Sequence, residues 1–575
     1  MVNLKAKPFY LTGEDIEWVE STLSNMTTEE KLGQIFVDML WQDEDDEIKR
    51  RNNKYGTGGY RYGNMSAQKL HHQNAVIQSS SKIPALIAAN IEAGGNGGVG
   101  GGTHIGDPVA IGATGNKQNA YNMGYYGNRE ASAIGCNWTF APIVDINYNW
   151  RNCVVSNRCF GSDPDMVLEY SLEYMRGAHD AGVACCMKHF PGDGCDERDQ
   201  HIVTTINDKS YEEWMNSFGK VYKGMIEAGV ESVMVGHIQA PEVTRKLRPG
   251  IADKDIMPAT MAPELLQDML RGILGFNGLI ITDATHMVGL TGKVRRSEFV
   301  PGVIMAGCDM ILYYRDKDED MMFLHQALEN GKLTMERLDE AVMRVLGFKA
   351  MLKLHKKAAE GTLIPDEAGL VCIGCEKHMD AARKVADEGI TLIKNIKADN
   401  LPLDLRKHKR IMLYSVDSAA TAAAVHGHKT AALSDMVKVE LKKRGFEVDT
   451  PVFAAGFNGK QLLASTPVTK FAKDYDAVML VLSIAGFSQS NERRIHWSMP
   501  MGPDIPWYVT ELPTYCISFN NPFHLIDVPM VPTYINAYSP DPWVIKATID
   551  KMMGLSEFKG VSTVDAFCGA WDTHL

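Results

Sequence analysis

Short apolar segments that end in a polar or charged residue recur through the first two thirds of the chain. Between them lie stretches with the amphipathic spacing of helices, such as 166–181, 211–228 and 263–274. Alternating strands and helices build parallel sheets, and a parallel barrel gathers the carboxyl ends of its strands around one site. The pattern therefore predicts an α/β fold, namely a TIM-type (β/α)8 barrel. Both a regular and an irregular barrel fit the pattern. The predicted strands are 85–90, 140–147, 183–190, 232–237, 278–283 and 309–313.

A second set of strands follows a segment that is punctuated by glycine and proline. A chain of 575 residues is too long for one core, so a second domain is expected. We predict a barrel domain over 1–355, a linker over 356–380 and a smaller α/β sandwich over 381–575, with a mainly structural or interfacial role. The predicted elements of the sandwich are strands 411–414, 477–482, 515–519 and 533–537, with helices 418–424 and 433–444.

Charge and hydropathy argue against some classes of binding partner. The net charge is -12, and an acidic surface disfavours a nucleic-acid or anionic-membrane partner. The first residues lack the apolar core of a signal peptide, and no apolar run is long enough to span a bilayer. We therefore expect a cytoplasmic protein without a membrane or nucleic-acid partner.

The eleven cysteines favour reduced thiols over a disulfide framework, because several stand in apolar, strand-like contexts. A metal site built from loop cysteines is the alternative, but these cysteines form no tight Cys-x-x-Cys pair, so we predict no metal site. The residues considered for it are Cys153, Cys159 and Cys195, with His189 or His201.

The predicted strand 183–190 ends in two polar side chains, Lys188 and His189, and opens into a loop that carries Asp199 and His201. An apolar strand gains no packing from a lysine and a histidine at its end, so these residues indicate chemistry at the barrel mouth. A carboxylate two residues from an imidazole can hold one tautomer and stabilise the imidazolium form. Asp199 and His201 are therefore a candidate acid/base dyad. The alternative is a solvent-exposed loop histidine.

Asp283 ends the most hydrophobic predicted strand, 278–283. A carboxylate there is partly desolvated and held on a rigid element, which suits a nucleophile that must approach a carbon at fixed geometry. The alternative is a helix N-cap, since an aspartate before Ala284 would cap a helix well. The presence of the His201 loop favours catalysis.

The segment from Lys188 to His201 resembles the pattern Lys-His-Phe-Pro-Gly-His-Gly-Asp-Thr-x-x-Asp-Ser-His of family 3 glycoside hydrolases, in the bacterial β-N-acetylglucosaminidase branch. The Asp-x-His ending distinguishes this branch from the β-glucosidases of the family. The positions kept without a gap are Lys188, His189, Phe190, Pro191, Gly192, Gly194, Asp199 and His201.

Further motifs follow in the order expected for that family, and they extend the resemblance over almost the whole chain. The barrel part has Phe-Ala-Pro-x-x-Asp-x-Asn at 140–147 and Arg-x-Phe-Gly-x-Asp at 158–163. The other matching segments are 258–260, 274–278, 282–284, 390–395 and 518–523.

The resemblance implies a role for each matching residue. Asp283 would be the nucleophile, His201 the acid/base and Asp199 its partner. No metal ion or organic cofactor is implied. The candidate substrate-binding residues are Asn90, Glu92, Asp145, Arg158, Lys188, His189 and His237.

Two departures from the family pattern fall in the expected sugar site. Asn90 stands where the family has an aspartate, and the arginine that follows shortly after is absent. An amide accepts fewer and weaker hydrogen bonds from sugar hydroxyls than a carboxylate does. We therefore expect altered recognition of the hydroxyls far from the reacting carbon, including the choice between gluco and galacto sugars. Asp193 replaces a histidine, and Asp196 adds a further carboxylate. We expect the extra carboxylates to raise the pKa of His201.

The low-complexity stretch Gly94–Gly102 admits two interpretations. A phosphate-binding loop would need a following Gly-Lys-Ser/Thr, which is absent. A mobile active-site loop is therefore favoured.

Together these features predict a retaining exo-acting β-N-acetylhexosaminidase, whose partner is a carbohydrate with terminal β-linked N-acetylhexosamine. A phosphorylase with the same residues is the nearest alternative, because a histidine acid/base does not repel an incoming phosphate as a glutamate would. A β-N-acetylgalactosaminidase and a catalytically silent sugar-binding protein are further alternatives. A β-glucosidase or xylosidase is disfavoured by the Asp-x-His ending at Asp199 and His201.

Overall fold

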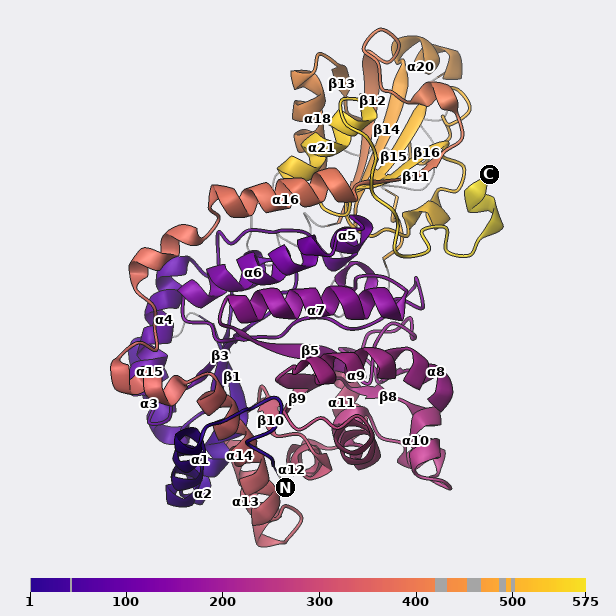
Figure 1. The fold of residues 1–575 in the computed structure, drawn as a ribbon. Helices are drawn as coiled ribbons and strands as arrows, with labels where there is room; N and C mark the ends of the chain where they lie inside the picture. The colour runs from indigo at the N-terminus through magenta and orange to yellow at the C-terminus, as the bar shows by residue number, and fades with distance from the viewer. Residues whose placement is uncertain (1, 42–43, 419–431, 452–466, 485–492, 498–501) are drawn as a thin grey trace. The chain divides into compact units, whose positions relative to one another are not determined.

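The computed structural model describes residues 2–41, 44–418, 432–451, 467–484, 493–497 and 502–575 (Figure 1). The chain divides into two compact units. The first comprises 1–105, 120–155 and 163–379, and the second comprises 106–119, 156–162 and 380–575. The predicted helix 418–424 falls almost wholly outside the described residues.

The first unit is a closed barrel of eight strands, in which every neighbouring pair is parallel. The order around the barrel is β1-β10-β9-β7-β5-β4-β3-β2, which follows the chain. The predicted TIM-type fold is therefore confirmed. The strands are β1 (Phe36–Leu40), β2 (Gly59–Tyr62), β3 (Leu86–Ala89), β4 (Trp138–Thr139), β5 (Ala184–Phe190), β7 (Ser232–Val235), β9 (Leu279–Ala284) and β10 (Met310–Leu312).

The strand prediction was wrong at 140–147. The fourth strand is the short Trp138–Thr139, and the predicted segment is irregular apart from one bridge between Ile143 and Lys188. Pro142 has no backbone N–H to give to a sheet, which explains why the ladder does not continue. The first strand, Phe36–Leu40, was missed because it contains Asp38, and a charged residue argues against a buried strand. The structure buries Asp38 and pairs its carboxylate with the ammonium of Lys317 at 2.7 Å.

Helices follow the strands and surround the barrel (Figure 1). The predicted helix 211–228 is two helices that meet at Ser217, and the predicted helix 263–274 is of the wider π type over Glu264–Ile273. The others are α1 (Gly13–Asn25), α2 (Thr28–Gln34), α3 (Asp45–Tyr55), α4 (Ala67–Ser80), α6 (Gln118–Ala133), α7 (Pro164–Asp180), α8 (Tyr211–Asn216), α9 (Phe218–Ala228), α10 (Pro241–Leu247), α11 (Val288–Thr291), α12 (Arg296–Ala306), α13 (Lys317–Glu329), α14 (Met335–Met351) and α15 (Leu354–Glu360).

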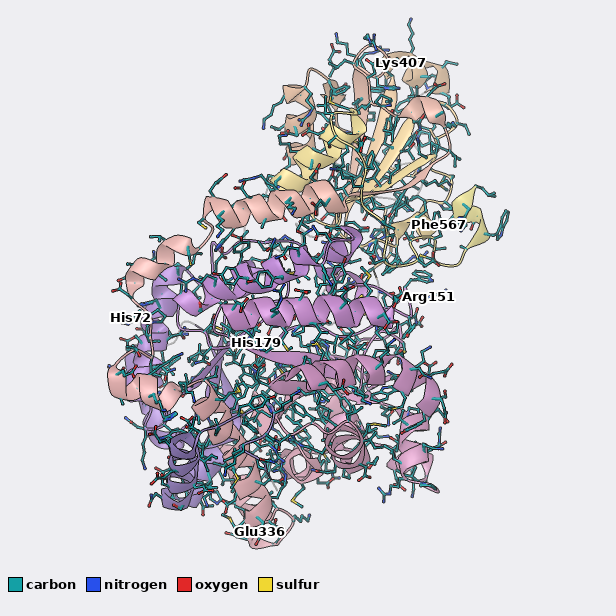
Figure 2. The ribbon with its side chains drawn as sticks, viewed as in Figure 1. His72, Arg151, His179, Glu336, Lys407 and Phe567 are labelled. Atoms are coloured by element: carbon teal, nitrogen blue, oxygen red, sulfur yellow. The ribbon has the colours of Figure 1, made fainter. Side chains whose placement is uncertain are left out.

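Large side chains close the barrel interior. The side chains of the described residues are drawn as sticks in Figure 2. Trp138 is fully buried and meets Phe140 and Phe348 edge to face, at ring-centroid distances of 4.8 and 5.3 Å. Its indole N–H donates to the hydroxyl of Ser232 on β7, at 2.8 Å. This packing fills the barrel, so the chemistry is confined to its ends.

The second unit is built on a six-stranded sheet of order β11-β16-β15-β14-β12-β13, in which only the β11–β16 pair is antiparallel. Apolar clusters cover both faces, with Met479 on one and its neighbour Leu480 on the other. The predicted second α/β domain is therefore confirmed. Its elements are β11 (Thr391–Asn395), β12 (Arg410–Asp417), β13 (Glu447–Asp449), β14 (Ala477–Ser483), β15 (Thr514–Ser518), β16 (Thr533–Asn536), α5 (Pro108–Ala113), α16 (Glu376–Gly389), α18 (Leu433–Lys443), α20 (Val468–Asp474) and α21 (Pro542–Met552).

Within the described part of the chain, no helix combines the length and the apolar character needed to cross a bilayer.

Candidate active site

The carboxyl end of β5 presents two charged or polar side chains that are both buried. Lys188 is 2 % exposed, and its ammonium lies 2.6 Å from a carboxylate oxygen of Glu92, just after β3. The Nδ1 atom of His189 lies 2.7 Å from Asp145, which is fully buried. A buried charge is tolerated only when it is paired, so both pairs fix their side chains at the barrel mouth.

Asp145 holds the start of the loop that follows β5 and carries Asp199 and His201, called the dyad loop below. One of its oxygens accepts the backbone N–H groups of His189 and Asp193, at 3.0 and 2.8 Å, and the other contacts the His189 imidazole. Both oxygens are therefore engaged within the protein. Asp145, itself a predicted sugar ligand, thus bonds the backbone and the ring of His189, another predicted ligand.

Gly194 fixes the path of this loop. Its φ is +111°, and a Cβ atom there would lie 1.9 Å from the carbonyl oxygen of Ile146. The carbonyl of Gly194 in turn accepts the N–H of Asn149 at 2.9 Å. Only glycine permits both the conformation and the close approach of the two backbones.

The candidate dyad is formed as predicted by sequence spacing. Asp199 is fully buried, and one of its oxygens accepts from the backbone N–H of His201 and contacts its Nδ1, at 2.8 and 2.6 Å. A carboxylate can only accept, so Nδ1 carries a proton and Nε2 is the atom that exchanges protons with a substrate. The imidazole remains 25 % exposed.

Backbone hydrogen bonds join the dyad loop to the segment that follows β9. The N–H of Val288 donates to the carbonyl of His201 at 2.9 Å, and the N–H of Gly289 donates to that of Gln200 at 3.1 Å. These bonds join the loop after β5 to the chain just beyond Asp283.

Asp283 lies at the end of β9 and is 8 % exposed. Burial raises its pKa, but the electrostatic attraction of His189, His237 and His201 outweighs burial, and the net pKa is lowered. The carboxylate is thus ionised at neutral pH although it is buried. The N-cap interpretation does not hold, because the next helix is α11, whose N-cap is Met287.

His237 follows β7 and is fully buried. Its Nε2 lies 3.1 Å from the carbonyl of Ala284, and its Nδ1 lies 3.1 Å from the hydroxyl of Thr260. Burial lowers its pKa, so the ring is neutral, with the proton on the nitrogen that faces the carbonyl. Hydrogen bonds at both ring nitrogens therefore fix the orientation of His237 next to the residue that follows Asp283.

His286 was missed by the sequence interpretation. Its ring is stacked on Tyr313 with centroids 5.7 Å apart, and burial lowers its pKa while the charge of Asp283 opposes this. A histidine three residues after a strand-end carboxylate was the signal that could have found it.

The remaining predicted substrate ligands divide between the two units. Asn90 and Glu92 directly follow β3 and are partly exposed, at the same end of the barrel as Asp283. Arg158 lies in the short 3-10 turn Ser156–Arg158, which belongs to the second unit. Its contact with a sugar stays a prediction.

The loop after β5 carries less negative charge than its sequence suggests. Asp196 is paired with the guanidinium of Arg198 at 2.5 Å. Burial and the charge of Asp145 raise the pKa of Asp193 to about 7, which favours its uncharged form. The premise that extra carboxylates surround His201 is therefore weakened.

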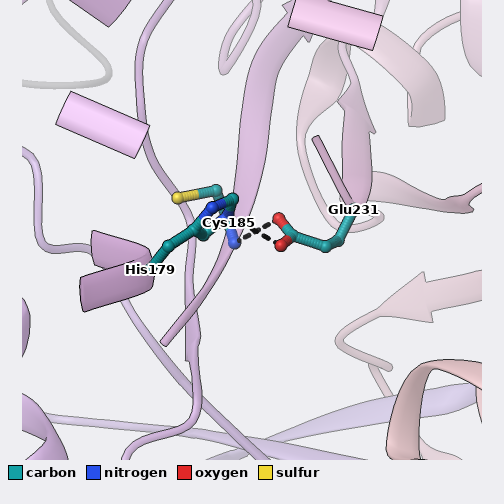
Figure 3. A group of neighbouring side chains, drawn as sticks. All are labelled: His179, Cys185 and Glu231. Carbon is teal, nitrogen blue, oxygen red and sulfur yellow. Dashed lines mark hydrogen bonds and ion pairs between the residues drawn. The ribbon is translucent and has the colours of Figure 1, made fainter. Parts of the chain in front are cut away.

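Among the described residues, one group of side chains has the spacing of metal ligands, and it lies at the amino ends of β5 and β7. The ligand atoms of His179, Cys185 and Glu231 lie within 4.8 Å of one another (Figure 3). Glu231 already accepts from the His179 ring at 2.7 Å and from the Cys185 N–H at 3.0 Å, and burial raises the pKa of the Cys185 thiol well above its usual range. These contacts favour an ion pair that ties α7, β5 and β7 together.

A parallel barrel that carries a buried carboxylate and a carboxylate-bound imidazole at the carboxyl ends of its strands has the features of an enzyme site. A family model described as the glycosyl hydrolase family 3 N-terminal domain matches residues 27–348. The chain is 40% identical over 575 residues, 100% of both chains, to a β-N-acetylglucosaminidase/β-glucosidase of Cellulomonas fimi. This chain belongs to glycosyl hydrolase family 3 and is a glycoside-cleaving enzyme.

Two further likenesses support the assignment. The solved structure of the β-glucoside phosphorylase BglX matches with a TM-score of 0.92 and 38% identity, and the match covers 99% of each chain. The β-hexosaminidase A of Pseudoalteromonas piscicida is 29% identical over 342 residues, 56% of each chain.

Proposed function

We propose that this chain is a retaining exo-acting enzyme that removes terminal β-linked N-acetylglucosamine through a covalent intermediate on Asp283. The observation that carries the proposal is the His201 imidazole, held by Asp199 and close enough to Asp283 to lower the pKa of that carboxyl. A retaining mechanism needs one nucleophile and one proton donor at the same bond, and these two groups supply them.

In the first step, His201 donates the proton on Nε2 to the glycosidic oxygen while Asp283 attacks the anomeric carbon. The carbon–oxygen bond to the aglycone breaks, and a glycosyl ester forms on Asp283. His201 is now neutral and can take a proton from the acceptor that attacks the ester. Asp199 stabilises the imidazolium form before the first step and again after the second.

The choice of sugar rests on two points. The relatives include an enzyme named for both N-acetylglucosaminide and glucoside cleavage, and a β-hexosaminidase. At the site, Asn90 offers an amide in place of a carboxylate, so it accepts fewer charge-assisted hydrogen bonds from remote hydroxyls. We therefore expect turnover of both N-acetylglucosaminides and glucosides. A comparison with N-acetylgalactosaminides tests whether the enzyme prefers the gluco or the galacto configuration.

Inorganic phosphate is the second candidate acceptor, and two observations favour it. The solved structure that matches over 99% of each chain is named a β-glucoside phosphorylase. The general base, His201, is neutral when the acceptor arrives, and the imidazoles of His189, His237 and His286 also interact electrostatically with Asp283. A site lined by imidazoles does not repel an anion as a second carboxylate would.

A panel of aryl β-glycosides, assayed with and without phosphate, tests these proposals. The panel contains N-acetylglucosamine, N-acetylgalactosamine, glucose and xylose. Free sugar formed at equal rates in both conditions supports hydrolysis, whereas phosphate-dependent turnover that yields a sugar 1-phosphate supports phosphorolysis. Tight sugar binding without turnover of any glycoside would contradict both and indicate a silent sugar-binding protein.

A further inference from the structure

The sequence contains a Cys-x-x-Cys pair, Cys372-Ile373-Gly374-Cys375, which the interpretation of the cysteines as isolated thiols does not cover. Both cysteines are partly exposed, whereas the strand cysteines Cys185 and Cys186 are buried. An oxidant in solution can therefore reach this pair and cannot reach those of the core.

The backbone already brings the two cysteines together. The N–H of Cys375 donates to the carbonyl of Cys372 at 3.3 Å, which closes a turn. Such a turn brings its first and last Cα atoms to within about 7 Å, close to the separation of roughly 4.4–6.8 Å that a disulfide spans. Gly374 supplies the left-handed residue of the turn, with φ of +65°.

The two thiols have different surroundings. The carbonyl of Cys375 accepts the N–H groups of His378 and Met379, so this cysteine stands at the N-terminus of α16. The sulfur of Cys372 lies 3.8 Å from the carbonyl of Arg129, and burial raises the pKa of its thiol. We assign Cys375, at the start of the helix, as the attacking sulfur and Cys372, whose sulfur lies against the carbonyl of Arg129, as the resolving one.

The same turn is bonded to a buried carboxylate, that of Glu130. Its Oε1 atom accepts from the N–H of Gly374 at 3.0 Å and contacts Nδ1 of His378 at 2.7 Å. Its Oε2 atom accepts the N–H of Thr103 at 2.7 Å. Glu130 thereby joins the cysteine turn to the end of the glycine-rich loop Gly94–Gly102.

Direct packing reinforces this link. A Cβ atom on Gly374 would lie 2.7 Å from the carbonyl oxygen of Gly101, so the turn and the loop are in contact. Within the loop, a Cβ atom on Gly97 would lie 1.9 Å from the carbonyl oxygen of Asn90. A continuous path of backbone contacts therefore runs from the cysteine pair to the predicted sugar ligand Asn90.

We propose that Cys372 and Cys375 form a reversible redox-active dithiol, and that its oxidation shifts the glycine-rich loop beside Asn90. A peroxide is the oxidant. The Cys375 thiolate attacks one oxygen of hydrogen peroxide, the O–O bond breaks, and a sulfenic acid forms. The other oxygen leaves as hydroxide and takes up the proton that the thiol had released, which gives water. The Cys372 thiol then attacks the sulfenic sulfur, the S–S bond forms, and a second water leaves. A small dithiol reductant reverses the reaction.

The full-length enzyme is treated with hydrogen peroxide, blocked with iodoacetamide and analysed by peptide mass spectrometry. We expect a peptide that has lost two hydrogen atoms and carries neither label at Cys372 or Cys375, and dithiothreitol should restore labelling of both. C372S and C375S should abolish the product, whereas C568S, at another partly exposed cysteine, should retain it. Separate over-oxidation of the two thiols, or a zinc ion that blocks labelling of the purified enzyme, would overturn the proposal.

The coupling to the sugar site has its own readout, which rests on the proposed function. Oxidation should raise the KM for an aryl β-glycoside by about fivefold, the low end of typical coupling between sites, and change kcat less. The C372S variant should show no such response to peroxide. An unchanged KM in enzyme proven to hold the disulfide would overturn the coupling. Because the mass readout needs no turnover, failure of the proposed function would be recognised separately.

Discussion

Buried aspartates at the two ends of the barrel pair with different partners. At the amino end, Asp309 is fully buried and contacts three guanidinium groups, those of Arg271, Arg337 and Arg344, at 2.7, 2.8 and 3.2 Å. At the carboxyl end, Asp145 and Asp199 are equally buried, but each holds an imidazole rather than a permanent cation.

The difference lies in what the partner can do. A guanidinium stays protonated, so the Asp309 cluster has one charge state near neutrality and serves to hold helices against strands. An imidazole gains or loses a proton near neutral pH, so a carboxylate that fixes one of its nitrogens prepares the other for proton transfer. The Asp309 cluster thus stabilises the fold, and we propose that Asp145 and Asp199 position reactive groups.

Substitution of the nucleophile should give the largest effect. Asp283→Ala is expected to lower kcat/KM for an aryl N-acetylglucosaminide by about 10⁴-fold or more, as removal of a nucleophile does in other enzymes. Thermal unfolding should still be cooperative, because Asp283 accepts from the N–H of its own neighbour Ala284 and this bond does not join two elements. Steady-state kinetics and calorimetry check both points. Activity within tenfold of wild type, about 1.4 kcal/mol, would contradict the nucleophile assignment.

The dyad partner should come next. Asp199→Asn keeps the shape but presents an amide to Nδ1 of His201, which disturbs the tautomer, so kcat should fall by about 10³-fold. Glu197→Gln is the matched control, because Glu197 is an exposed carboxylate on the same loop. A similar loss of kcat in both variants would mean that the negative charge of the loop, and not the contact between Asp199 and His201, determines the rate.

A change at the amino end should affect stability and spare the chemistry. Asp309→Ala leaves three buried guanidinium groups without their shared carboxylate, so the free energy of unfolding should fall by about 3–5 kcal/mol. Asp318→Ala removes an exposed partner of Lys54 and should cost less than about 1 kcal/mol. Denaturant titrations measure both. A selective loss of kcat in the folded Asp309 variant would break the contrast between the two ends.

The last expected effect is on the pH dependence of stability. Burial and the charge of Asp145 raise the pKa of Asp193 to about 7, above that of the unfolded chain. Its contribution to stability is therefore full below about pH 4 and is lost as the pH rises through about 7. Asp193→Asn carries no charge at any pH, so its free energy of unfolding should change less over this range. An identical pH dependence in both proteins would refute the assignment.

The fold and the dyad were predictable because they rest on local patterns. Strand ends such as Lys188 and Asp283 are read directly from apolar segments that stop at a polar residue, and the spacing of Asp199 and His201 is a two-residue relation. The strand around Asp38 was missed because its charge is neutralised by Lys317, which lies far away in the sequence.

Other features depend on contacts that no local pattern reveals. The engagement of Asp145 by the backbone of its neighbouring loop emerged only from the folded chain. The same holds for the partnership of Glu130 with the cysteine turn, which joins residues on different elements. Tertiary placement, rather than residue type, decides whether such a carboxylate binds substrate or organises a loop.

Trapping of the covalent intermediate tests the central claim most directly. A 2-deoxy-2-fluoro-β-glucoside with a good leaving group slows both steps, so the glycosyl ester should accumulate, and peptide mass spectrometry should locate one fluorosugar on Asp283. The Asp283→Ala protein should remain unlabelled. A fluorosugar on another residue, or turnover of the reagent without any covalent species, would contradict the account.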